Sequence, residues 1–322
     1  MVIITGAAGF IASCLAHRLL RQDPEVKLLL VDKFTFESKN KNLPDDPRCQ
    51  LMERSELFDY LDRKEPEISQ VYHLGARTDT AEQNVSILKK LNVEFSKDIW
   101  SYCALFEIPL VYASSAATYG DGSLGFEDNH EVVSQLKPLN PYGESKQAFD
   151  QWVLDQPFTP PSWYGVKFFN VYGPNEFHKG RMASVIFHAF NQIQKTGKMK
   201  LFRSHREDVE DGMQSRDFIF IDDVLQCCQF LMTENVNSGL YNIGTGQARS
   251  FKDLVLAVFA ALDIEPNIEF IDTPEDIRET YQYFTEANMD KLKAAGYSQK
   301  FTSLENGVEH YVKNHLAQGK YY

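Results

Sequence analysis

The chain of 322 residues is long enough for one large domain or two modest ones. Apolar residues make up 43% of it and charged residues 24%, which is the balance of an ordinary globular protein. A formal net charge of -12 argues against broad binding to nucleic acid, and no apolar run approaches the roughly 20 residues that span a bilayer, so we expect neither as a partner.

Short apolar strands alternate with helical segments through the first half of the chain. A β-branched strand at residues 2–5 is followed by a glycine turn at 6–9 and by helical apolar spacing at 10–20. Further strands are predicted at 26–31, 71–73, 109–113 and 166–169, with a helix at 92–106. This alternation predicts an α/β fold with a doubly wound parallel sheet.

The glycine turn predicts a dinucleotide site. Gly6 and Gly9 follow one strand, open a helix, and precede Asp32 at the end of the next strand. Glycines let backbone N–H groups approach a pyrophosphate, and an acidic residue at that place suits a ribose hydroxyl. Asp32 favours NAD because a carboxylate repels a 2′-phosphate, whereas Lys33 and Lys39 are either solvated loop charges or neutralise one.

A smaller unit is expected to follow the first. We assign residues 1–173 to a dinucleotide-binding domain, with a segment at about 217–245 crossing back to it. Residues 174–322 are assigned mainly to a smaller α/β domain that binds substrate, and the polar stretch 204–215 is expected to be a loop.

A phenol and an amine lie four residues apart at Tyr142 and Lys146, so on a helix they share one face. A nearby ammonium favours the phenolate, which would lower the pKa of Tyr142. Ser115 ends a predicted strand, at the sheet edge where doubly wound folds bind ligands. Each feature alone is common, but together with the glycine turn they predict a nicotinamide-dependent enzyme.

These segments resemble the extended short-chain dehydrogenase/reductase superfamily, whose members act mainly on nucleotide sugars. Within it, residues 112–120, 169–174 and 178–185 are similar to the family of ADP-L-glycero-D-manno-heptose 6-epimerases. The segments 281–285 and 292–297 extend the likeness nearly to the last residue.

The resemblance implies an isomerase that inverts C6 of ADP-D-glycero-D-manno-heptose, a step of lipopolysaccharide core biosynthesis. It implies bound NADP, with NAD as the alternative, and transient oxidation of the sugar to a 6-keto intermediate. Tyr142 and Lys179 match the two acid/base residues of the family, Ser115 matches the hydroxyl that orients the reacting oxygen, and Lys146 matches the residue that holds the nicotinamide ribose.

The same match gives binding residues. Cofactor positions, together with those from the glycine turn, are Gly6, Gly9, Phe10, Ile11, Asp32, Lys33, Lys39, Gly75, Ala76, Asn92, Lys146, Val171 and Lys179. Substrate positions are Asn170, Arg181, His188, Phe202, Ser204, Arg216 and Tyr281.

Three arginines and one acidic segment need comment. A guanidinium can grip a diphosphate with two hydrogen bonds, and the alternative for Arg216 is a salt bridge to Asp217 or Asp222. Arg181 replaces a small polar residue of the family, and Arg77 stands where the family usually has a small residue. The acidic segment 207–215 is longer than expected. These departures bear on the sugar nucleotide more than on the reaction.

Other functions stay open at this point. An NAD-dependent 4-epimerase fits the same motifs, whereas a dehydratase needs an acid after Ser115, where this chain has Ala116 and Ala117. A catalytically silent dinucleotide sensor on the same fold is an alternative of another class. The histidines form no ligand-spaced cluster, so we propose no metal.

Location and assembly are expectations as well. Five cysteines without metal-site spacing, together with an N-terminal strand in place of a signal peptide, predict a cytoplasmic protein. A homo-oligomer is expected from the resemblance.

Overall fold

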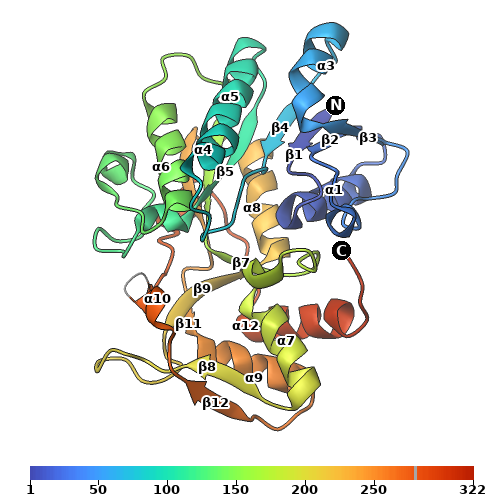
Figure 1. The fold of residues 1–322 in the computed structure, drawn as a ribbon. Coiled ribbons are helices and arrows are strands. Elements are labelled where there is room, and N and C mark those ends of the chain that lie inside the picture. Colours follow the sequence, from blue (N-terminus) through green and yellow to red (C-terminus); the bar gives the residue numbers. More distant parts are fainter. Residues whose placement is uncertain (279–280) are drawn as a thin grey trace.

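The computed structural model describes residues 1–278 and 281–322. Seven parallel strands form its large sheet, with helices on both faces (Figure 1). From edge to edge the strands are β3 (Cys49–Glu53), β2 (Leu28–Asp32), β1 (Val2–Thr5), β4 (Gln70–His73), β5 (Leu110–Ser115), β6 (Trp163–Phe168) and β10 (Gly239–Ile243). The expected doubly wound parallel sheet is confirmed.

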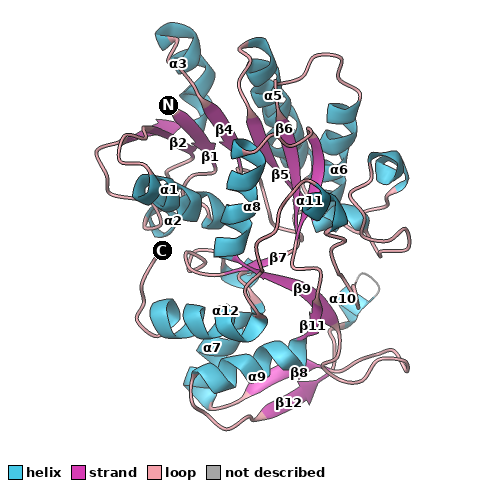
Figure 2. Cartoon of the chain, turned by 180° about the vertical axis from the view of Figure 1, so that it is seen from behind, coloured by secondary structure: helices cyan, strands magenta, loops and turns pink. Residues whose placement is uncertain are grey.

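Both faces of the large sheet are buried at its central strand β1. Three of the four residues of β1 are apolar, and the fourth, Thr5, is buried with its hydroxyl hydrogen-bonded to His73. Ile3 faces one core, and Val2 and Ile4 face the other, as the alternation of side chains along a strand requires. The first core is covered by α3 (Leu57–Lys64), α5 (Phe95–Leu105) and α6 (Pro141–Leu154). The second is covered by α1 (Phe10–Gln22) and α8 (Ile221–Thr233), and Figure 2 shows α8 lying across that face.

A crevice is expected where the strand order reverses. The chain runs from β1 outward to β2 and β3 and then returns to β4 on the other side of β1. Ligands bind at such switch points, beyond the carboxyl ends of the strands. Gly6 directly follows β1 with a φ of +68°, and a Cβ added to it would lie 2.5 Å from the Cα atom of Gly75, which follows β4. The two chain segments therefore meet here through bare backbone.

The remaining elements form a second body below the large sheet in Figure 1. Its strands are β7 (Asn170–Tyr172), β9 (Ser215–Phe220) and β11 (Ala248–Ser250) in one sheet, and β8 (Met199–Phe202) and β12 (Ile268–Ile271) in another. Its principal helices are α7 (Val185–Thr196), α9 (Phe251–Ala261) and α12 (Leu304–Tyr311).

Where the chain first passes from the large sheet to the second body, the connection is a single residue. Only Phe169 separates β6 in the large sheet from β7 in the small one, and its N–H donates to the Ile243 carbonyl of β10. The chain returns through α8 to β10, at the edge of the large sheet, whereas β9 stays with β7. The division into two domains near residue 173 stays a prediction.

Some elements differ from the sequence-based expectation. The helix predicted at 92–106 begins at Phe95, because residues 89–94 form a π-helical segment in which Asn92 turns inward. Strand β3 was not predicted, since it is an edge strand of mixed apolar and polar sequence in which no residue is fully buried. The shorter helices are α2 (Glu37–Asn40), α4 (Val85–Leu88), α10 (Glu275–Arg278) and α11 (Asp290–Ala294). Within residues 1–278 and 281–322, no helix has the length and apolar character that crossing a bilayer requires.

Candidate active site

A groove follows the carboxyl ends of the central strands. We divide it into an inner cavity of about 310 Å³, a middle cavity of about 420 Å³ and an outer cavity of about 330 Å³. The inner and middle cavities share Phe10, Ile11 and Lys179, and the middle and outer cavities share Gly6 and Lys39. The groove is therefore continuous and has the elongated form that a dinucleotide and a second ligand need.

The glycine turn at the groove fits the phosphates of a dinucleotide. Gly9 is the N-cap of α1, and a Cβ added there would lie 2.9 Å from the Gly6 carbonyl oxygen. Side chains are thus kept out of this turn, so the free N–H groups at the start of α1 are open to an anion. Phe10, Ile11, Gly75 and Ala76 line the same part of the groove, as predicted for cofactor positions.

Asp32 is held by one ammonium group and two backbone N–H groups. The Lys39 ammonium lies 2.7 Å from each oxygen of the buried Asp32 carboxylate, which also accepts the N–H groups of Ala8 and Lys33. The expected neighbourhood of these residues is therefore found, but the carboxylate is neutralised rather than bare. Lys33 is exposed at the rim of the outer cavity, which Arg54 also lines.

Asn92 has a different position from the one expected of a cofactor contact. Its side chain is fully buried, lines none of the three cavities, and exchanges two hydrogen bonds of 2.8 and 3.0 Å with the backbone of Arg77. It also donates to the Ser145 hydroxyl on α6, at 2.9 Å. Asn92 therefore fixes the loop after β4, whose residues line the middle cavity, against α6.

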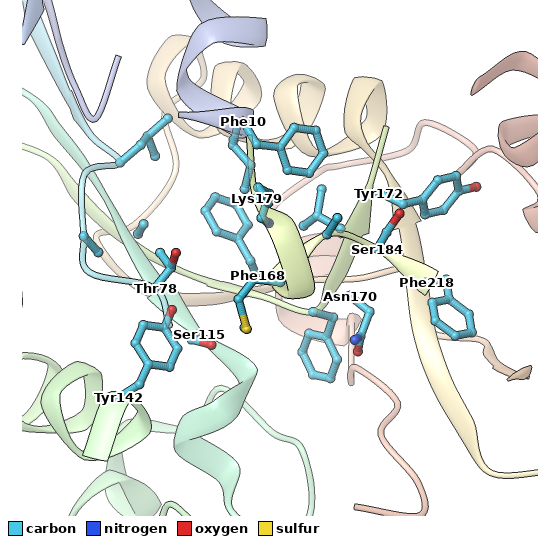
Figure 3. Close-up of a pocket in the computed structure, with 18 of the residues that line it drawn as sticks. Phe10, Thr78, Ser115, Tyr142, Phe168, Asn170, Tyr172, Lys179, Ser184 and Phe218 are labelled. Atoms are coloured by element: carbon cyan, nitrogen blue, oxygen red, sulfur yellow. The ribbon is translucent and has the colours of Figure 1, made fainter. Parts of the chain in front are cut away.

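Tyr142, Lys146 and Ser115 all line the inner cavity, as predicted. Figure 3 shows Tyr142 and Ser115 side by side. Asn140 accepts the Gly143 N–H and caps the start of α6, so the helix places Tyr142 and Lys146 on its cavity face. In Figure 3 the Tyr142 hydroxyl points toward Ser115.

The expected lowering of the Tyr142 pKa is not found. Burial raises the pKa of Tyr142, and the Ser115 hydroxyl opposes that shift. The Lys146 ammonium points toward the sheet, where it donates to the Ala113 carbonyl at 2.9 Å, and burial lowers its pKa to about 8. Burial is the largest cause of both shifts, and it acts against the charged form of each group.

Lys179 reaches the inner cavity from another part of the chain. It lies in the loop between β7 and α7, with its ammonium 5.1 Å from the centre of the Phe10 ring. Burial lowers its pKa, an effect that the nearby Glu176 opposes. Figure 3 shows Lys179 beside Phe10, across the pocket from Tyr142 and Ser115, so two groups that exchange protons line one cavity from different elements.

The predicted substrate residues divide into two groups. Asn170 and the predicted cofactor residue Val171 line the inner cavity at the start of β7, and Figure 3 shows Asn170 near Phe218 at the far end. The others line none of the three cavities; they are Arg181, His188, Phe202, Ser204, Arg216 and Tyr281.

Arg216, one of this second group, is a buried cation, and Tyr281 lies beside it. Arg216 is 8% exposed and lies two residues before Phe218 on β9, and its guanidinium is 5.6 Å from the centre of the Tyr281 ring. Phe202 packs edge-on against Tyr281, and Ser204 begins the loop that follows β8. Arg216 donates to the carbonyls of Ser215 and Gln282.

The salt bridge considered for Arg216 is not formed. Asp217 instead accepts from Thr245, Gly246 and Ala287, and Asp222 accepts from Tyr322. Among the residues that the structure describes, no carboxylate lies within 4.0 Å of the Arg216 guanidinium. A buried cation in this state favours an anionic ligand.

Arg181 and His188 lie outside the groove on exposed surface. The Arg181 guanidinium is 2.9 Å from the Asp79 carboxylate, and the His188 imidazole lies 3.4 Å from the Arg181 carbonyl oxygen. Arg77 approaches the same Asp79 at 3.9 Å. The two arginines that depart from the family pattern therefore meet on one carboxylate at the rim of the middle cavity.

Sequence reasoning missed several residues that line the groove. Thr78, Met182 and Phe168 line the inner cavity, and Phe36 and Arg54 line the outer one. Thr78 follows the Gly75-Ala76 turn after β4, so a hydroxyl just past a central strand was the signal that could have found it. Arg54 carried no such signal, because the strand that places it was not predicted.

Known proteins resemble the chain over nearly its full length. It is 44% identical to an ADP-L-glycero-D-manno-heptose-6-epimerase of Fusobacterium nucleatum, over 99% of this chain and 98% of that protein. It is also 44% identical to a protein of the same name from Nitratidesulfovibrio vulgaris, over 98% of each chain. The resemblance drawn from the sequence is confirmed by these relatives.

Solved structures agree at the level of the fold. The Helicobacter pylori ADP-L-glycero-D-manno-heptose-6-epimerase superposes with a TM-score of 0.82 at 27% identity, covering 97% of this chain and 95% of that one. A UDP-N-acetylglucosamine 4-epimerase from Methanobrevibacter ruminantium reaches the same TM-score of 0.82 at 20% identity, over 98% of each chain, which is a likeness of fold alone. Residues 2–244 match the model of the NAD dependent epimerase/dehydratase family, and the chain belongs to that family, whose cofactor is a nicotinamide dinucleotide.

Proposed function

We propose that the protein inverts C6 of ADP-D-glycero-D-manno-heptose to give ADP-L-glycero-D-manno-heptose. The names of relatives at 44% identity support this substrate. The observation that carries the reaction type is the placement of Tyr142 and Lys179, which face one cavity from different elements. An epimerase that works through a ketone must exchange a proton with the sugar oxygen in each of its two orientations, and this arrangement supplies a group for each.

Bound nicotinamide dinucleotide would supply reversible oxidation of the sugar alcohol to a ketone, so that no net redox change occurs. The protein must take the proton from the alcohol oxygen and return one when the ketone is reduced on its other face. Burial favours the neutral phenol at Tyr142 and the neutral amine at Lys179. The phenol is then ready to donate a proton and the amine to accept one. Ser115, beside Tyr142, would orient the reacting oxygen.

The lining of the inner cavity supports an epimerase over a dehydratase. Loss of water from a sugar needs an acid at the leaving hydroxyl. No carboxylic side chain is among the residues described as lining the inner cavity, and Ser115 is followed by two alanines. A 4-epimerase on another nucleotide sugar differs only in which carbon faces the two groups, so the substrate assay decides between them.

Arg216 would hold the diphosphate of the substrate. It is buried, lacks a carboxylate within 4.0 Å among the described residues, and lies on β9 beyond Phe218 at the end of the inner cavity. A diphosphate can accept two parallel hydrogen bonds from one guanidinium. Tyr281 and Phe202 present aromatic rings beside it, which suits a base or a ribose.

We propose NADP as the cofactor in preference to NAD. The outer cavity is lined by four cationic side chains and by one acidic side chain, that of Asp32. The cations are Lys33, Lys39, Arg54 and Arg77. Lys39 already neutralises Asp32, and Arg77 pairs with Glu82 at 2.9 Å, so Lys33 and Arg54 are the cations that favour a phosphate on the ribose. Mass spectrometry of the dinucleotide released when the purified protein is denatured tests this assignment.

The reaction is tested by incubating the purified protein with each ADP-heptose epimer and following their interconversion by NMR. We expect both starting materials to reach the same mixture without added reductant. The absence of interconversion in protein that carries its cofactor would refute the proposal. Conversion of a UDP-sugar at C4 instead would favour the 4-epimerase.

The alternative of a catalytically silent sensor is tested with a variant of Tyr142. Tyr142→Phe should keep dinucleotide affinity and lose turnover if the site is catalytic. A cytoplasmic location and a homo-oligomer also belong to the proposal, and light scattering of the purified protein measures the assembly.

A further inference from the structure

A buried carboxylate lies behind the catalytic face of α6. Asp150 follows Lys146 by one helical turn and Tyr142 by two, so the three residues share one face of the helix. Asp150 is 0% exposed. One of its oxygens accepts from the Lys167 ammonium at 2.6 Å and from the Ser114 hydroxyl at 2.7 Å, and the other accepts from the Tyr112 hydroxyl at 3.1 Å.

Lys167 completes this network from the neighbouring strand. It is 1% exposed, pairs with Ser114 in the register of β5 and β6, and also donates to Thr118 at 2.9 Å. The network therefore joins β5, the turn after β5, α6 and β6. Two of its members, Ser114 and Lys167, directly precede the cavity residues Ser115 and Phe168.

Packing alone does not explain two buried charges at this place. Transferring an ion pair from water into a protein interior is expensive, and apolar residues of similar volume are often as stable or more stable. The neighbouring core is apolar and aromatic, so it offers surroundings for such a replacement. The pair is therefore better explained by what it does for the adjacent cavity.

We propose that Asp150 and Lys167 are a positioning pair for the reaction: they hold β5 and α6 in register, so that Ser115 meets Tyr142, and their opposite charges set the protonation of Lys146. This inference rests on the proposed function for its activity readout and on the chemistry of Lys146 itself for a second, independent readout.

The charges around Lys146 determine in which direction each substitution should shift its pKa. On α6 its neighbours one helical turn away are Asp150 and Tyr142, and from β4 His73 is within its electrostatic reach. Lys167 on β6 contacts Asp150 at 2.6 Å. Burial and Lys146 itself lower the pKa of His73 to about 3, so this imidazole is neutral at physiological pH. Asp150 opposes the effect of burial on the pKa of Lys146.

Two single substitutions should therefore act in opposite directions. Asp150→Asn removes the anion and leaves Lys167 charged, so Lys146 should lose its proton at a lower pH. Lys167→Met removes the competing cation and leaves the anion, with Ser114 and Tyr112 still donating to it, so Lys146 should keep its proton to a higher pH. Loss of packing alone would move both variants in the same direction.

The first measurement needs no turnover. Purified protein is acetylated with a trace of acetic anhydride at a series of pH values, and the labelled fraction of Lys146 is measured by mass spectrometry. We expect the midpoint of labelling to fall by roughly one pH unit in Asp150→Asn and to rise by roughly half a unit in Lys167→Met. Equal midpoints in all proteins would overturn the electrostatic role.

The second measurement separates positioning from stability. In the double variant Asp150→Asn with Lys167→Met neither member of the pair is left as an unpaired buried charge, so the melting temperature should recover toward that of the wild type. We expect kcat to stay reduced by at least 10-fold, with KM changed by less than about 3-fold. Recovery of kcat together with the melting temperature would reduce the pair to a structural role.

A matched control is a buried carboxylate that lines none of the three cavities. Asp223 on α8 is 3% exposed and accepts from the N–H and hydroxyl of Thr302. Asp223→Asn should lower the melting temperature and leave both the labelling midpoint and the pH profile of kcat unchanged. Should the wild type itself lack epimerase activity, the proposed function fails while the labelling shifts still decide on the pair.

Discussion

The Lys39 ammonium bridges both oxygens of the Asp32 carboxylate, at 2.7 Å each, at the outer end of the groove. Lys39→Gln should weaken NADP binding about 10-fold more than NAD binding, because it removes one cation and exposes a carboxylate that repels a 2′-phosphate. Calorimetric titration of cofactor-free protein with each dinucleotide measures the difference. An equal loss for NAD and NADP would contradict a phosphate in the outer cavity.

Arg216→Met should raise the KM for the nucleotide sugar by roughly 10- to 100-fold, because a buried charge-assisted contact to a diphosphate is lost. Dinucleotide affinity should not change. Arg249 offers a matched control, since it is the cross-strand neighbour of Arg216 on β11 and pairs at the surface with Asp253 and Glu305. Arg249→Met should leave KM within about 2-fold, as expected for an exposed ion pair.

Tyr142→Phe should reduce kcat by roughly 10²- to 10⁴-fold, because a general acid/base is removed while the packing of the ring is kept. Lys179→Met should reduce the conversion to a similar degree. Steady-state rates with each epimer, alongside fluorescence titration of the dinucleotide, measure both effects. If either variant keeps its full rate in both directions, two groups are not needed.

Lys146→Met should stabilise the protein at pH 7. The folded-state pKa of Lys146 is about 8, below that of an exposed lysine, so burying its ammonium costs stability fully below pH 8. That cost falls as pH rises toward the unfolded-state value of about 10.4. Urea denaturation should therefore give the variant about 1–3 kcal/mol more stability than the wild type at pH 7, and a smaller difference at pH 9.5. A variant less stable than the wild type at pH 7 would argue against this cost.

Arg181→Ser should speed the release of bound dinucleotide by about 2- to 5-fold at low salt, since the Arg181–Asp79 ion pair links the two walls of the middle cavity. The difference should vanish near 1 M salt, where charges are screened within about 3 Å. Stopped-flow displacement measures the rate, and Lys313→Ser removes a comparable exposed pair on the remote C-terminal segment as a control. A difference that persists in high salt would point to a cause other than charge.

The residues that spacing in the sequence correctly placed together are those that are close to one another in the chain. Gly6 and Gly9 lie within one turn, and Tyr142 and Lys146 lie one helical turn apart, so spacing alone places them together. The partners that set their chemistry are distant in the chain. Lys167 reaches Asp150 only after β6 has paired with β5, and no pattern around either residue indicates that contact.

The Tyr142 pKa and the place of Asn92 illustrate the same limit. The lysine four residues from Tyr142 was a correct neighbour, but how deeply both groups are buried depends on the whole sheet, and burial decides the direction of the shift. Asn92 was predicted from sequence as a cofactor contact. In the structure it bonds to the backbone of Arg77 instead, and this contact depends on a local π-helical turn that apolar periodicity does not reveal.

The single residue Phe169 between β6 and β7 has a consequence for how such an enzyme can change. Most residues placed to bind the dinucleotide lie before Phe169, apart from Val171 and Lys179, and those placed for the sugar nucleotide, Asn170 and Arg216 among them, lie after it. The segments that contact the sugar nucleotide can therefore be varied while the sheet that holds the dinucleotide is left unchanged. A library confined to the strands and loops beyond Phe169, with Val171 and Lys179 kept, would sample new sugars on the same oxidation chemistry.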